Sequence, residues 1–365
     1  MRRLAPRFLI SGYYGFGNLG DEAILRMIVA GLRRHWPLGT IDVLSARPEE
    51  TAHDHGVEAT SRWDRAAVRN ATMRADVVLS GGGGLLQNAT SLKSLLYYAE
   101  IIRRAVHAGK PTMVFAQSIG PLDFIGKQTV RECCRGLAAA TVRDRRSMDL
   151  LAPLVAGIEI RRTADPVFLY ELDDEVDLAS EGLGPDSEPL VIVAVRKTAR
   201  FNEGIGVLAA AVDRLAERWG AHVAFVPFAG QPDAEAATQV IRKCRSKPVL
   251  FDLGGLARVA GAIRRASLVI GVRLHALILA ARFGTPFLAV AYDPKVAGLA
   301  EDLAYPLAPL WTPGPQPCAQ SVEDAVDDAW TRRAELSAAL AEPVAAMRTL
   351  AEHNFTTLAE TIGRA

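Results

Sequence analysis

The sequence has little of several features that mark particular classes of protein. Only four cysteines occur among 365 residues, and no C-x-x-C pair is present, so neither a disulfide framework nor a zinc site is indicated. No apolar run approaches the ~20 residues that span a bilayer. The apolar stretch at residues 8–10, behind the N-terminal arginines, is too short for the core of a signal peptide. We therefore expect a soluble, cytoplasmic protein with reduced thiols.

An excess of charge of either sign is also absent. The chain has 42 Lys and Arg residues against 41 Asp and Glu residues, without a basic block or an aromatic-basic stripe. This balance argues against nucleic acid as the main partner. Half of the residues are hydrophobic, and the length is sufficient for two domains of ordinary size.

Strand-like apolar runs alternate with helix-like segments along the chain, which predicts parallel sheets with helices on both faces. In the first half we expect strands at residues 7–11, 40–44, 75–80, 111–116 and 140–143, and helices at residues 22–34, 92–108, 127–139 and 147–154. In the second half we expect strands at residues 190–195, 222–227, 268–270 and 287–291, and helices at residues 205–219, 233–244 and 321–365, the last interrupted at Pro343.

An acidic segment rich in turn formers interrupts this alternation and predicts a linker at residues 173–189. We expect a Rossmann-like domain at residues 1–172, a second at 190–340, and a helical tail at 341–365. Two doubly wound α/β domains joined in this way describe the glycosyltransferase-B (GT-B) architecture. The active site is then expected in an interdomain cleft, with the acceptor on the first domain and the donor on the second.

The loop after the first expected strand contains a literal G-x-G-x-x-G pattern, formed by Gly15, Gly17 and Gly20. This is a dinucleotide fingerprint. However, the second strand ends in Ser and Ala rather than in the acid that would bind a ribose, and its acid, Asp42, lies at its start. NAD binding is therefore disfavoured.

The residues that follow these glycines also weaken the dinucleotide interpretation. Asp21 and Glu22 occupy the start of the expected helix, where carboxylates favour the helix dipole but repel a phosphate. With Asn18 and its backbone amides, the loop is better suited to sugar hydroxyls; a tight turn without a ligand is the alternative. A second glycine run, residues 81–84, includes Gly82 and Gly83 and is either an anion-binding nest or a flexible turn.

The stretch from residue 271 to 295 combines Arg273, His275 and Lys295 in mostly apolar or small surroundings. Each falls just past the end of an expected strand, at the edge where open α/β sheets bind ligands. Three cationic or titratable groups there predict a small anionic substrate with a proton to be moved. Arg196 and Arg143 also follow strands, although Arg143 also fits a surface charge run over residues 143–146.

Six segments in order, from residue 12 to 295, carry a resemblance to a known family. They are GYYGFGNLGDEAIL (12–25), GGGGLL (81–86), QSIGP (117–121), VRD with Ser147 (142–144), ADP (164–166), and RLHAL with YDPK (273–277 and 292–295). Together they resemble the polysaccharide pyruvyl transferases, and most closely the CsaB-type branch, which modifies secondary cell wall polymers that anchor S-layers. One departure is Ser118, where the family pattern suggests Gly.

The resemblance implies a GT-B-like enzyme that transfers pyruvate from phosphoenolpyruvate to two hydroxyls of one sugar, forming a cyclic ketal and releasing phosphate. The implied acceptor is N-acetylmannosamine of a lipid-linked disaccharide, reached from the cytoplasm with possible peripheral contact at the inner face of the membrane. No cofactor or metal is expected.

In this interpretation His275 is the catalytic acid, because an imidazole titrates near neutrality. The expected donor-binding residues are Arg273, Lys295, Arg196 and Arg143, since Arg forks suit carboxylate and phosphate groups. The expected acceptor-binding or cleft-loop residues are Gly15, Gly17, Asn18, Asp21, Gly82, Gly83 and Gln117.

Two other functions stay open at this point. A GT-B glycosyltransferase that uses a nucleotide sugar would need a carboxylate for the ribose, and Glu301 or Glu323 could serve, although neither lies in a convincing motif. A sugar-binding module without enzymatic activity would leave Arg273, His275 and Lys295 unexplained.

Overall fold

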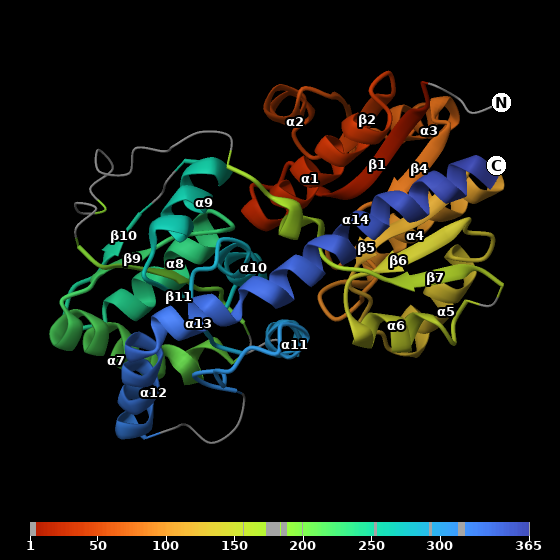
Figure 1. Cartoon of the computed structure of the whole chain (residues 1–365). Coiled ribbons are helices and arrows are strands. Elements are labelled where there is room, and N and C mark those ends of the chain that lie inside the picture. Colours follow the sequence, from red (N-terminus) through yellow and green to blue (C-terminus); the bar gives the residue numbers. More distant parts are fainter. Residues whose placement is uncertain are drawn as a thin grey trace. The chain divides into compact units, whose positions relative to one another are not determined.

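The computed structural model describes residues 5–155, 157–172, 183, 188–198, 200–251, 254–291, 294–312 and 318–364. The chain divides into two compact units (Figure 1). Unit 1 comprises Met1–Leu169 and Met347–Ala365, and unit 2 comprises Tyr170–Ala346. Most of the predicted linker, namely residues 173–182 and 184–187, lies outside the described residues.

Within its described residues, unit 1 is built on a parallel seven-stranded sheet of order β3-β2-β1-β4-β5-β6-β7. The strands are β1 (Arg7–Tyr14), β2 (Thr40–Ser45), β3 (Glu58–Ser61), β4 (Val77–Ser80), β5 (Thr112–Gln117), β6 (Ala139–Val142) and β7 (Glu159–Arg162). The order reverses between β1 and β4, so the topological switch point of this doubly wound sheet lies there.

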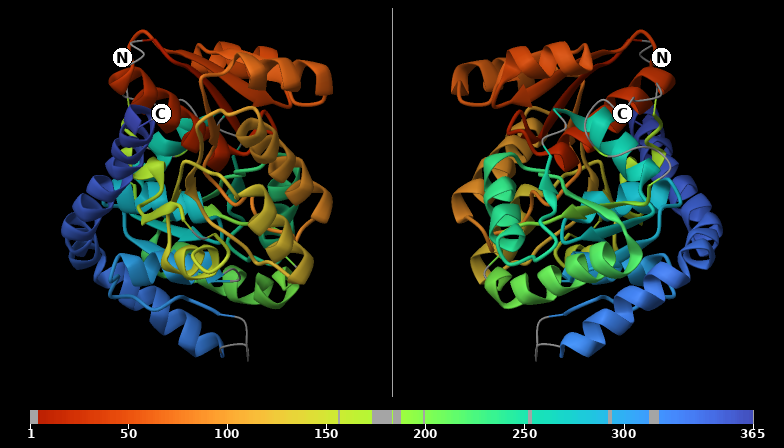
Figure 2. Two further views of the ribbon diagram at one scale, coloured as in Figure 1. Left: turned by 90° about the vertical axis from the view of Figure 1, so that its right-hand side faces the viewer. Right: turned by 90° about the vertical axis from the view of Figure 1, so that its left-hand side faces the viewer.

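The helices of unit 1 cover both faces of its sheet (Figures 1 and 2). They are α1 (Leu19–His35), α2 (Pro48–His55), α3 (Arg65–Arg74), α4 (Leu92–His107), α5 (Phe124–Cys133), α6 (Arg145–Leu151), the 3-10 turn η1 (Pro166–Leu169) and the end of α14 (Ala341–Arg364). Val114 of β5 joins the core formed with α4 and α5, whereas its neighbour Phe115 meets Phe355 of α14. Alternate residues of the buried strand therefore face opposite helix layers.

Unit 2 repeats this plan on a smaller scale. Its described strands form a parallel sheet of order β10-β9-β8-β11-β12, with β8 (Leu190–Ala194), β9 (His222–Phe225), β10 (Val249–Leu250), β11 (Leu268–Gly271) and β12 (Phe287–Ala289). Its helices are α7 (Phe201–Trp219), α8 (Gln231–Ile241), α9 (Leu256–Arg265), α10 (Leu274–Arg282), α11 (Pro294–Asp302), α12 (Ala319–Thr331), α13 (Arg333–Ala339) and the start of α14. The switch point lies between β8 and β11.

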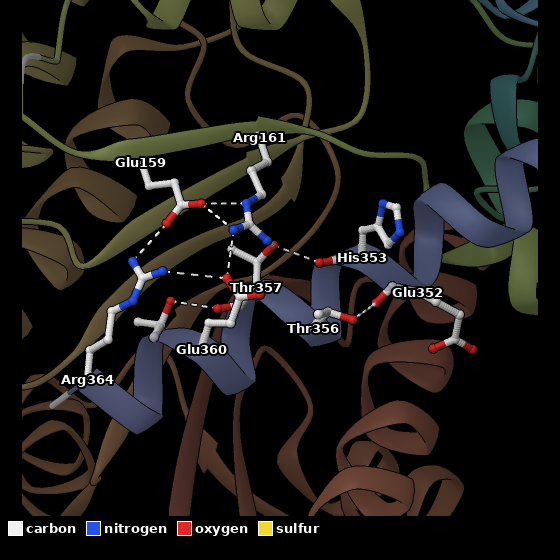
Figure 3. Close-up of polar contacts among 9 residues, drawn as sticks. Glu159, Arg161, Glu352, His353, Thr356, Thr357, Glu360 and Arg364 are labelled. Carbon is white, nitrogen blue, oxygen red and sulfur yellow. Dashed lines mark hydrogen bonds and ion pairs between the residues drawn. The ribbon is translucent and has the colours of Figure 1, made fainter.

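The C-terminal helix α14 is fixed to the edge strand of unit 1 by polar contacts (Figure 3). Arg161 of β7 pairs with Glu159 beside it and with Glu360 of α14, and Arg364 pairs with Glu159 at 2.9 Å. Nearby, the fully buried Asn354 donates to the carbonyl of Ala164 at 3.0 Å. Residues 347–364, predicted as part of a separate tail, thus contribute to the core and edge of unit 1.

Two expected helices show where the sequence misplaces a boundary. The helix expected at residues 127–139 is α5, which starts earlier because Asp123 caps it through the amide of Gly126 at 2.7 Å. It ends before Gly136, whose φ of 85° does not fit a right-handed helix. The interruption expected at Pro343 falls earlier, at Leu340 between α13 and α14. Pro343 itself lies in the first turn of α14, where no intrahelical N–H bond is lost.

Candidate active site

The cationic residues predicted to bind the donor in unit 2 follow neighbouring strands. Arg196 follows β8 and Arg273 follows β11, on either side of the switch point, and Lys295 comes after β12. The strands are parallel, so these residues lie at one edge of the sheet, where their charges favour an anionic ligand. Tyr292 and Asp293, which belong to the same predicted motif, lie outside the described residues.

Arg273 is held in a fixed orientation by Asp233 of α8. Its Nε donates to Asp233 Oδ2 at 2.8 Å, and its Nη2 pairs with Oδ1. Asp233 is buried and also accepts bonds from the amides of Phe228 and Ala229, at 3.1 and 2.9 Å. Among the described residues nothing bonds to Nη1 of Arg273, so one face of the fork is available to a ligand.

Sequence reasoning missed Asp233. The available signal was an acid in the first turn of the helix that follows β9, at the same sheet edge as Arg273. From its position alone, Asp233 could interact with the dipole of its own helix or pair with an arginine. Which of the two it does depends on the side-by-side placement of β8, β9 and β11.

His275 and Lys295 are each the second residue of a helix, α10 and α11 respectively, and both are half-buried. Arg273 is the N-cap residue of α10. Helix N-termini present unpaired amides and the positive end of the helix dipole, and such ends bind phosphate. The edge of unit 2 therefore combines two helix N-termini with guanidinium, imidazole and ammonium groups.

The glycine-rich loop between β1 and α1 uses its polar side chains to build the start of α1. Asn18 caps the helix by accepting from the amide of Gly20 at 3.1 Å, and Glu22 Oε1 accepts from the amide of Gly15 at 2.9 Å. A carboxylate thus binds the amide that a dinucleotide pyrophosphate would need. This contact argues against NAD binding at the literal fingerprint. Gly17 is exposed, with a φ of 72°.

The glycine run after β4 is required by close packing against α1. A Cβ at Gly83 would lie 2.9 Å from Asp21 Oδ1, and one at Gly82 would lie 2.7 Å from a methyl carbon of Ile24. The Tyr14 hydroxyl lies against Gly81 in the same way. Both Gly82 and Gly83 are buried, so the structure provides a packing reason for these glycines and places Asp21 beside them.

Gln117, at the end of β5, ties β5 to β4. Its Nε2 donates to the carbonyl and the hydroxyl of Ser80, at 2.9 and 2.7 Å. Three buried polar atoms near this point have no hydrogen-bond partner within the described part of the chain: Ser11 Oγ, Tyr14 Oη and Gln117 Oε1. Buried polar atoms are nearly always bonded in native proteins. These three buried atoms can therefore form hydrogen bonds that the described part of unit 1 does not supply.

Arg143 belongs to a buried network in unit 1. It pairs with Asp165, and both side chains are almost completely buried. Its Nε donates to Ser118 Oγ at 2.7 Å, and Ser118 donates to Asp144 Oδ2 at 2.7 Å. The serine that departs from the family pattern thus links Arg143 to Asp144. A structural role explains this network, and we expect Arg143 to support unit 1 rather than to bind the donor as its position in the sequence suggested.

The hydrogen bonds of this network also affect the ionisation of Asp144. Burial acts to raise its pKa, but hydrogen bonds from Ser118 and Ser147 and the positive charge of Arg143 outweigh burial and lower the pKa below its usual value. Asp144 is therefore ionised at neutral pH and caps α6 through the amide of Ser147 at 2.8 Å.

In the part of the chain that the structure describes, no group of three or more His, Cys, Asp or Glu side chains could hold a metal ion. Among the same residues, no helix has the length and apolarity needed to cross a membrane.

Comparison with known families agrees with the arrangement of these motifs. The sequence model of one family, polysaccharide pyruvyl transferase, matches residues 18–294, which is most of the chain. This chain belongs to the polysaccharide pyruvyl transferase family. The match includes Arg143, Arg196, Arg273 and His275, and it ends one residue before Lys295. As a pyruvyl transferase family member, the protein is a transferase; assignment to the CsaB-type branch stays a prediction.

Several solved structures share the fold of this pyruvyl transferase family member. Anabaena Alr3699/HepE in complex with UDP-glucose has a TM-score of 0.67 at 11% identity, covering 99% of this chain and 100% of that chain. A putative UDP-N-acetylglucosamine 2-epimerase from Listeria monocytogenes has a TM-score of 0.67 at 11% identity, with 99% and 98% covered. A glycosyltransferase from Rickettsia africae has a TM-score of 0.57 at 10% identity, with 99% and 96% covered. The predicted fold class, α/β with two Rossmann-like domains of GT-B type, is confirmed.

Proposed function

We propose that this protein transfers the pyruvyl group of phosphoenolpyruvate to two hydroxyls of one sugar, forming a cyclic ketal and releasing phosphate. The observation that carries the proposal is the gathering of Arg196, Arg273, His275 and Lys295 after neighbouring strands of unit 2, in a chain of the pyruvyl transferase family. A small donor with a carboxylate and a phosphate requires such a concentration of positive charge.

The free Nη1 of Arg273, the ammonium of Lys295 and the N-terminus of α10 are the groups that we assign to the donor. Asp233 holds the Arg273 fork by two of its nitrogens, which fixes the third nitrogen before the ligand arrives. Such preorganisation reduces the entropy cost of binding. Arg196 is exposed, and in the same proposal its charge attracts the anionic donor at long range.

His275 supplies the proton in the proposed reaction. Its imidazolium protonates the methylene carbon of phosphoenolpyruvate, which becomes the methyl group and leaves an oxocarbenium-like centre at the neighbouring carbon. One sugar hydroxyl adds there and returns its proton to the imidazole. The bond to phosphate then breaks, the second hydroxyl closes the ring, and its proton leaves with the phosphate. An imidazole both donates and accepts a proton, which suits both halves of this cycle.

The acceptor is proposed from the resemblance to the CsaB-type branch. It is N-acetylmannosamine of a lipid-linked disaccharide that is a precursor of a cell wall polymer for S-layer anchoring. The reaction needs no cofactor and no metal, and nucleic acid is not a partner. The proposal places the protein in the cytoplasm, with peripheral contact at the inner face of the membrane.

A nucleotide-sugar glycosyltransferase is the second candidate, since a structure with the same fold contains UDP-glucose. Of the carboxylates considered for the ribose, Glu323 instead pairs with Arg214 of α7 at 3.1 Å. Thermal stabilisation separates the two candidates, because a ligand stabilises the state that binds it. Phosphoenolpyruvate is expected to raise the Tm, and UDP-glucose to leave it unchanged.

A phosphate-release assay tests the reaction itself. Purified protein, phosphoenolpyruvate and a short-chain alkyl-diphosphate disaccharide ending in N-acetylmannosamine are expected to yield phosphate and a product heavier by the pyruvate ketal. Stabilisation by UDP-glucose alone, without phosphate release from any pair of donor and acceptor, would reject the proposal in favour of the second candidate.

A further inference from the structure

An aromatic cluster lies at the carboxyl edge of the sheet of unit 1, and the function proposed above assigns no role to it. It contains Tyr13 and Phe16 from the β1–α1 segment, Trp63 from the turn after β3, and Tyr97 and Tyr98 from α4. Trp63 is 67% exposed and Tyr13 is 40% exposed. Apolar residues scattered singly over a surface need no functional explanation. Exposed rings grouped at the ligand-binding edge of a doubly wound sheet instead indicate a binding surface.

The exposed rings of this aromatic cluster are held in place by other rings. Tyr13 stacks on Phe16 with centroids 4.1 Å apart and an angle of 10° between the ring planes. Phe16 meets Trp63 edge-on at 6.1 Å. Both geometries are favourable for aromatic pairs. The exposed faces of Tyr13 and Trp63 are therefore positioned before any ligand binds.

Arg62 packs against the buried side of the aromatic cluster. It is only 8% exposed, and its guanidinium carbon lies 4.3–5.5 Å from the ring centroids of Phe16, Trp63, Tyr97 and Tyr98. Its Nη1 donates to the carbonyl of Gly12 at 3.0 Å. No carboxylate pairs with Arg62 in the described part of the chain, and its Nε has no partner there. Cation–π contacts therefore replace the usual ion pair.

The groups around the cluster favour an uncharged occupant. Asp64 caps α3 through the amides of Ala66 and Ala67 and is followed by the exposed Arg65. Glu22 of α1 accepts from the amide of Gly15 and pairs with His55 at 3.3 Å. The Arg62 guanidinium is buried on the inner side of the rings, so the accessible surface of the cluster consists mainly of ring faces. The C–H face of a pyranose is apolar and weakly positive and packs on the negative face of an aromatic ring.

We propose that Tyr13 and Trp63, held by Phe16 and Arg62, form a stacking platform for a pyranose ring of the acceptor glycan. Because Tyr13 is parallel to Phe16 and Phe16 is perpendicular to Trp63, the sugar stacks on the exposed face of Trp63 and Tyr13 borders its edge. This inference rests on the proposed function, because it names how the acceptor of that reaction is recognised. Phe16 and Arg62 are positioning residues.

Acceptor kinetics at saturating phosphoenolpyruvate test the platform. With the alkyl-diphosphate disaccharide that ends in N-acetylmannosamine, Trp63→Ala and Tyr13→Ala are expected to raise the acceptor KM by about tenfold. The donor KM is expected to stay within about twofold of wild type, and Trp63→Phe to recover most of the affinity because a ring face remains. Leu38→Ala and Met73→Ala are matched controls, since Leu38 and Met73 are 69% and 56% exposed and lie towards the opposite edge of the sheet.

Titration calorimetry of the free disaccharide, without phosphoenolpyruvate, separates this inference from the proposed function. If wild type binds the disaccharide and Trp63→Ala loses that affinity, the platform stands even where no phosphate is released and the proposed reaction fails. Equal affinities of wild type, Trp63→Ala and Tyr13→Ala for the disaccharide would overturn the platform. An affinity loss confined to the alkylated compound would also overturn it, because the rings would then contact the lipid chain.

Discussion

The carboxyl edges of the two sheets are built from the same topology but use their charged residues in opposite ways. In unit 1, Arg143 is buried in an ion pair with Asp165, and Arg62 is buried beneath aromatic rings. In unit 2, Arg273 is held by Asp233 through two of its three guanidinium nitrogens, and Arg196 is exposed. One edge uses arginine to hold its own loops, and the other keeps positive charge available for an anion.

This contrast indicates how a duplicated architecture can divide the substrates of a transfer reaction. A carboxylate and a phosphate need cationic donors and helix N-termini, which unit 2 provides. A sugar needs ring faces and mixed polar groups, which unit 1 provides at the edge formed by β1, β3 and β4. Variants at the two edges test this division.

Removing the proposed acid is expected to have the largest effect. His275→Ala should lower kcat for phosphate release by about 10²–10⁴-fold and leave the KM for phosphoenolpyruvate nearly unchanged, because the imidazole acts on the methylene carbon rather than on the charged groups. Steady-state phosphate release measures both constants. His107→Ala on the exposed end of α4 is the matched control. Unchanged turnover in His275→Ala would exclude the acid role.

Breaking the buried pair of unit 1 should affect stability rather than donor binding. Arg143→Met removes the cation from the buried Asp165, which keeps its bond from the amide of Val167 at 2.9 Å. Breaking a buried ion pair in this way destabilises proteins by about 3–5 kcal/mol. Urea-induced unfolding measures the change in the free energy of unfolding. The KM for phosphoenolpyruvate, measured on the folded fraction, should stay within about twofold. A large rise in this KM at normal stability would instead assign Arg143 to the donor.

The corresponding change in unit 2 should differ in its effect on the donor. Arg273→Ala is expected to raise the KM for phosphoenolpyruvate by roughly 10–100-fold, the equivalent of one charge-assisted contact. It also leaves the buried Asp233 without its cation, so its loss of stability should be similar to that of Arg143→Met. Arg264→Ala on the exposed side of α9 is the matched control. Similar donor constants for Arg273→Ala and Arg143→Met would remove the contrast between the two edges.

The smallest effect is expected at Asp144 and depends on pH. Its pKa is lowered in the folded protein, so the ionised form contributes stability above its unfolded pKa of about 3.9. That contribution is lost as pH falls through the lower folded pKa. Asp144→Asn keeps a helix cap but should lose about 1–2 kcal/mol at pH 7. Its stability should change less than that of wild type below about pH 4. Parallel curves of unfolding free energy against pH for wild type and Asp144→Asn would contradict this expectation.

Much of the fold could be predicted from the sequence because buried parallel strands are short apolar runs between amphipathic helices. Residues 75–80, 111–116 and 268–270 all fall on observed strands, within one or two residues at each end. The edge strand β7 (Glu159–Arg162) was missed since its four residues are mostly polar. Its partner α14 also could not be predicted there, because nearly two hundred residues separate Arg161 from Glu360.

The candidate site could be predicted only in part, for a related reason. Arg196, Arg273 and Lys295 were recognisable because each follows an expected strand, and parallel strands end at one edge. Asp233 and Arg62 were not, since their importance depends on contacts made across the sheet. The glycine run at residues 81–84 was open to two interpretations, and the packing of Asp21 and Ile24 against Gly82 and Gly83 favours close approach over a flexible turn.

Calorimetric titration with phosphoenolpyruvate measures donor binding to unit 2 by itself, because it requires neither acceptor nor turnover. The account predicts one binding site per chain in the wild type. It predicts at least about tenfold weaker binding in Arg273→Ala and Lys295→Ala, and wild-type affinity in Arg264→Ala. Absence of binding to the wild-type protein, or equal affinity in all four proteins, would contradict it.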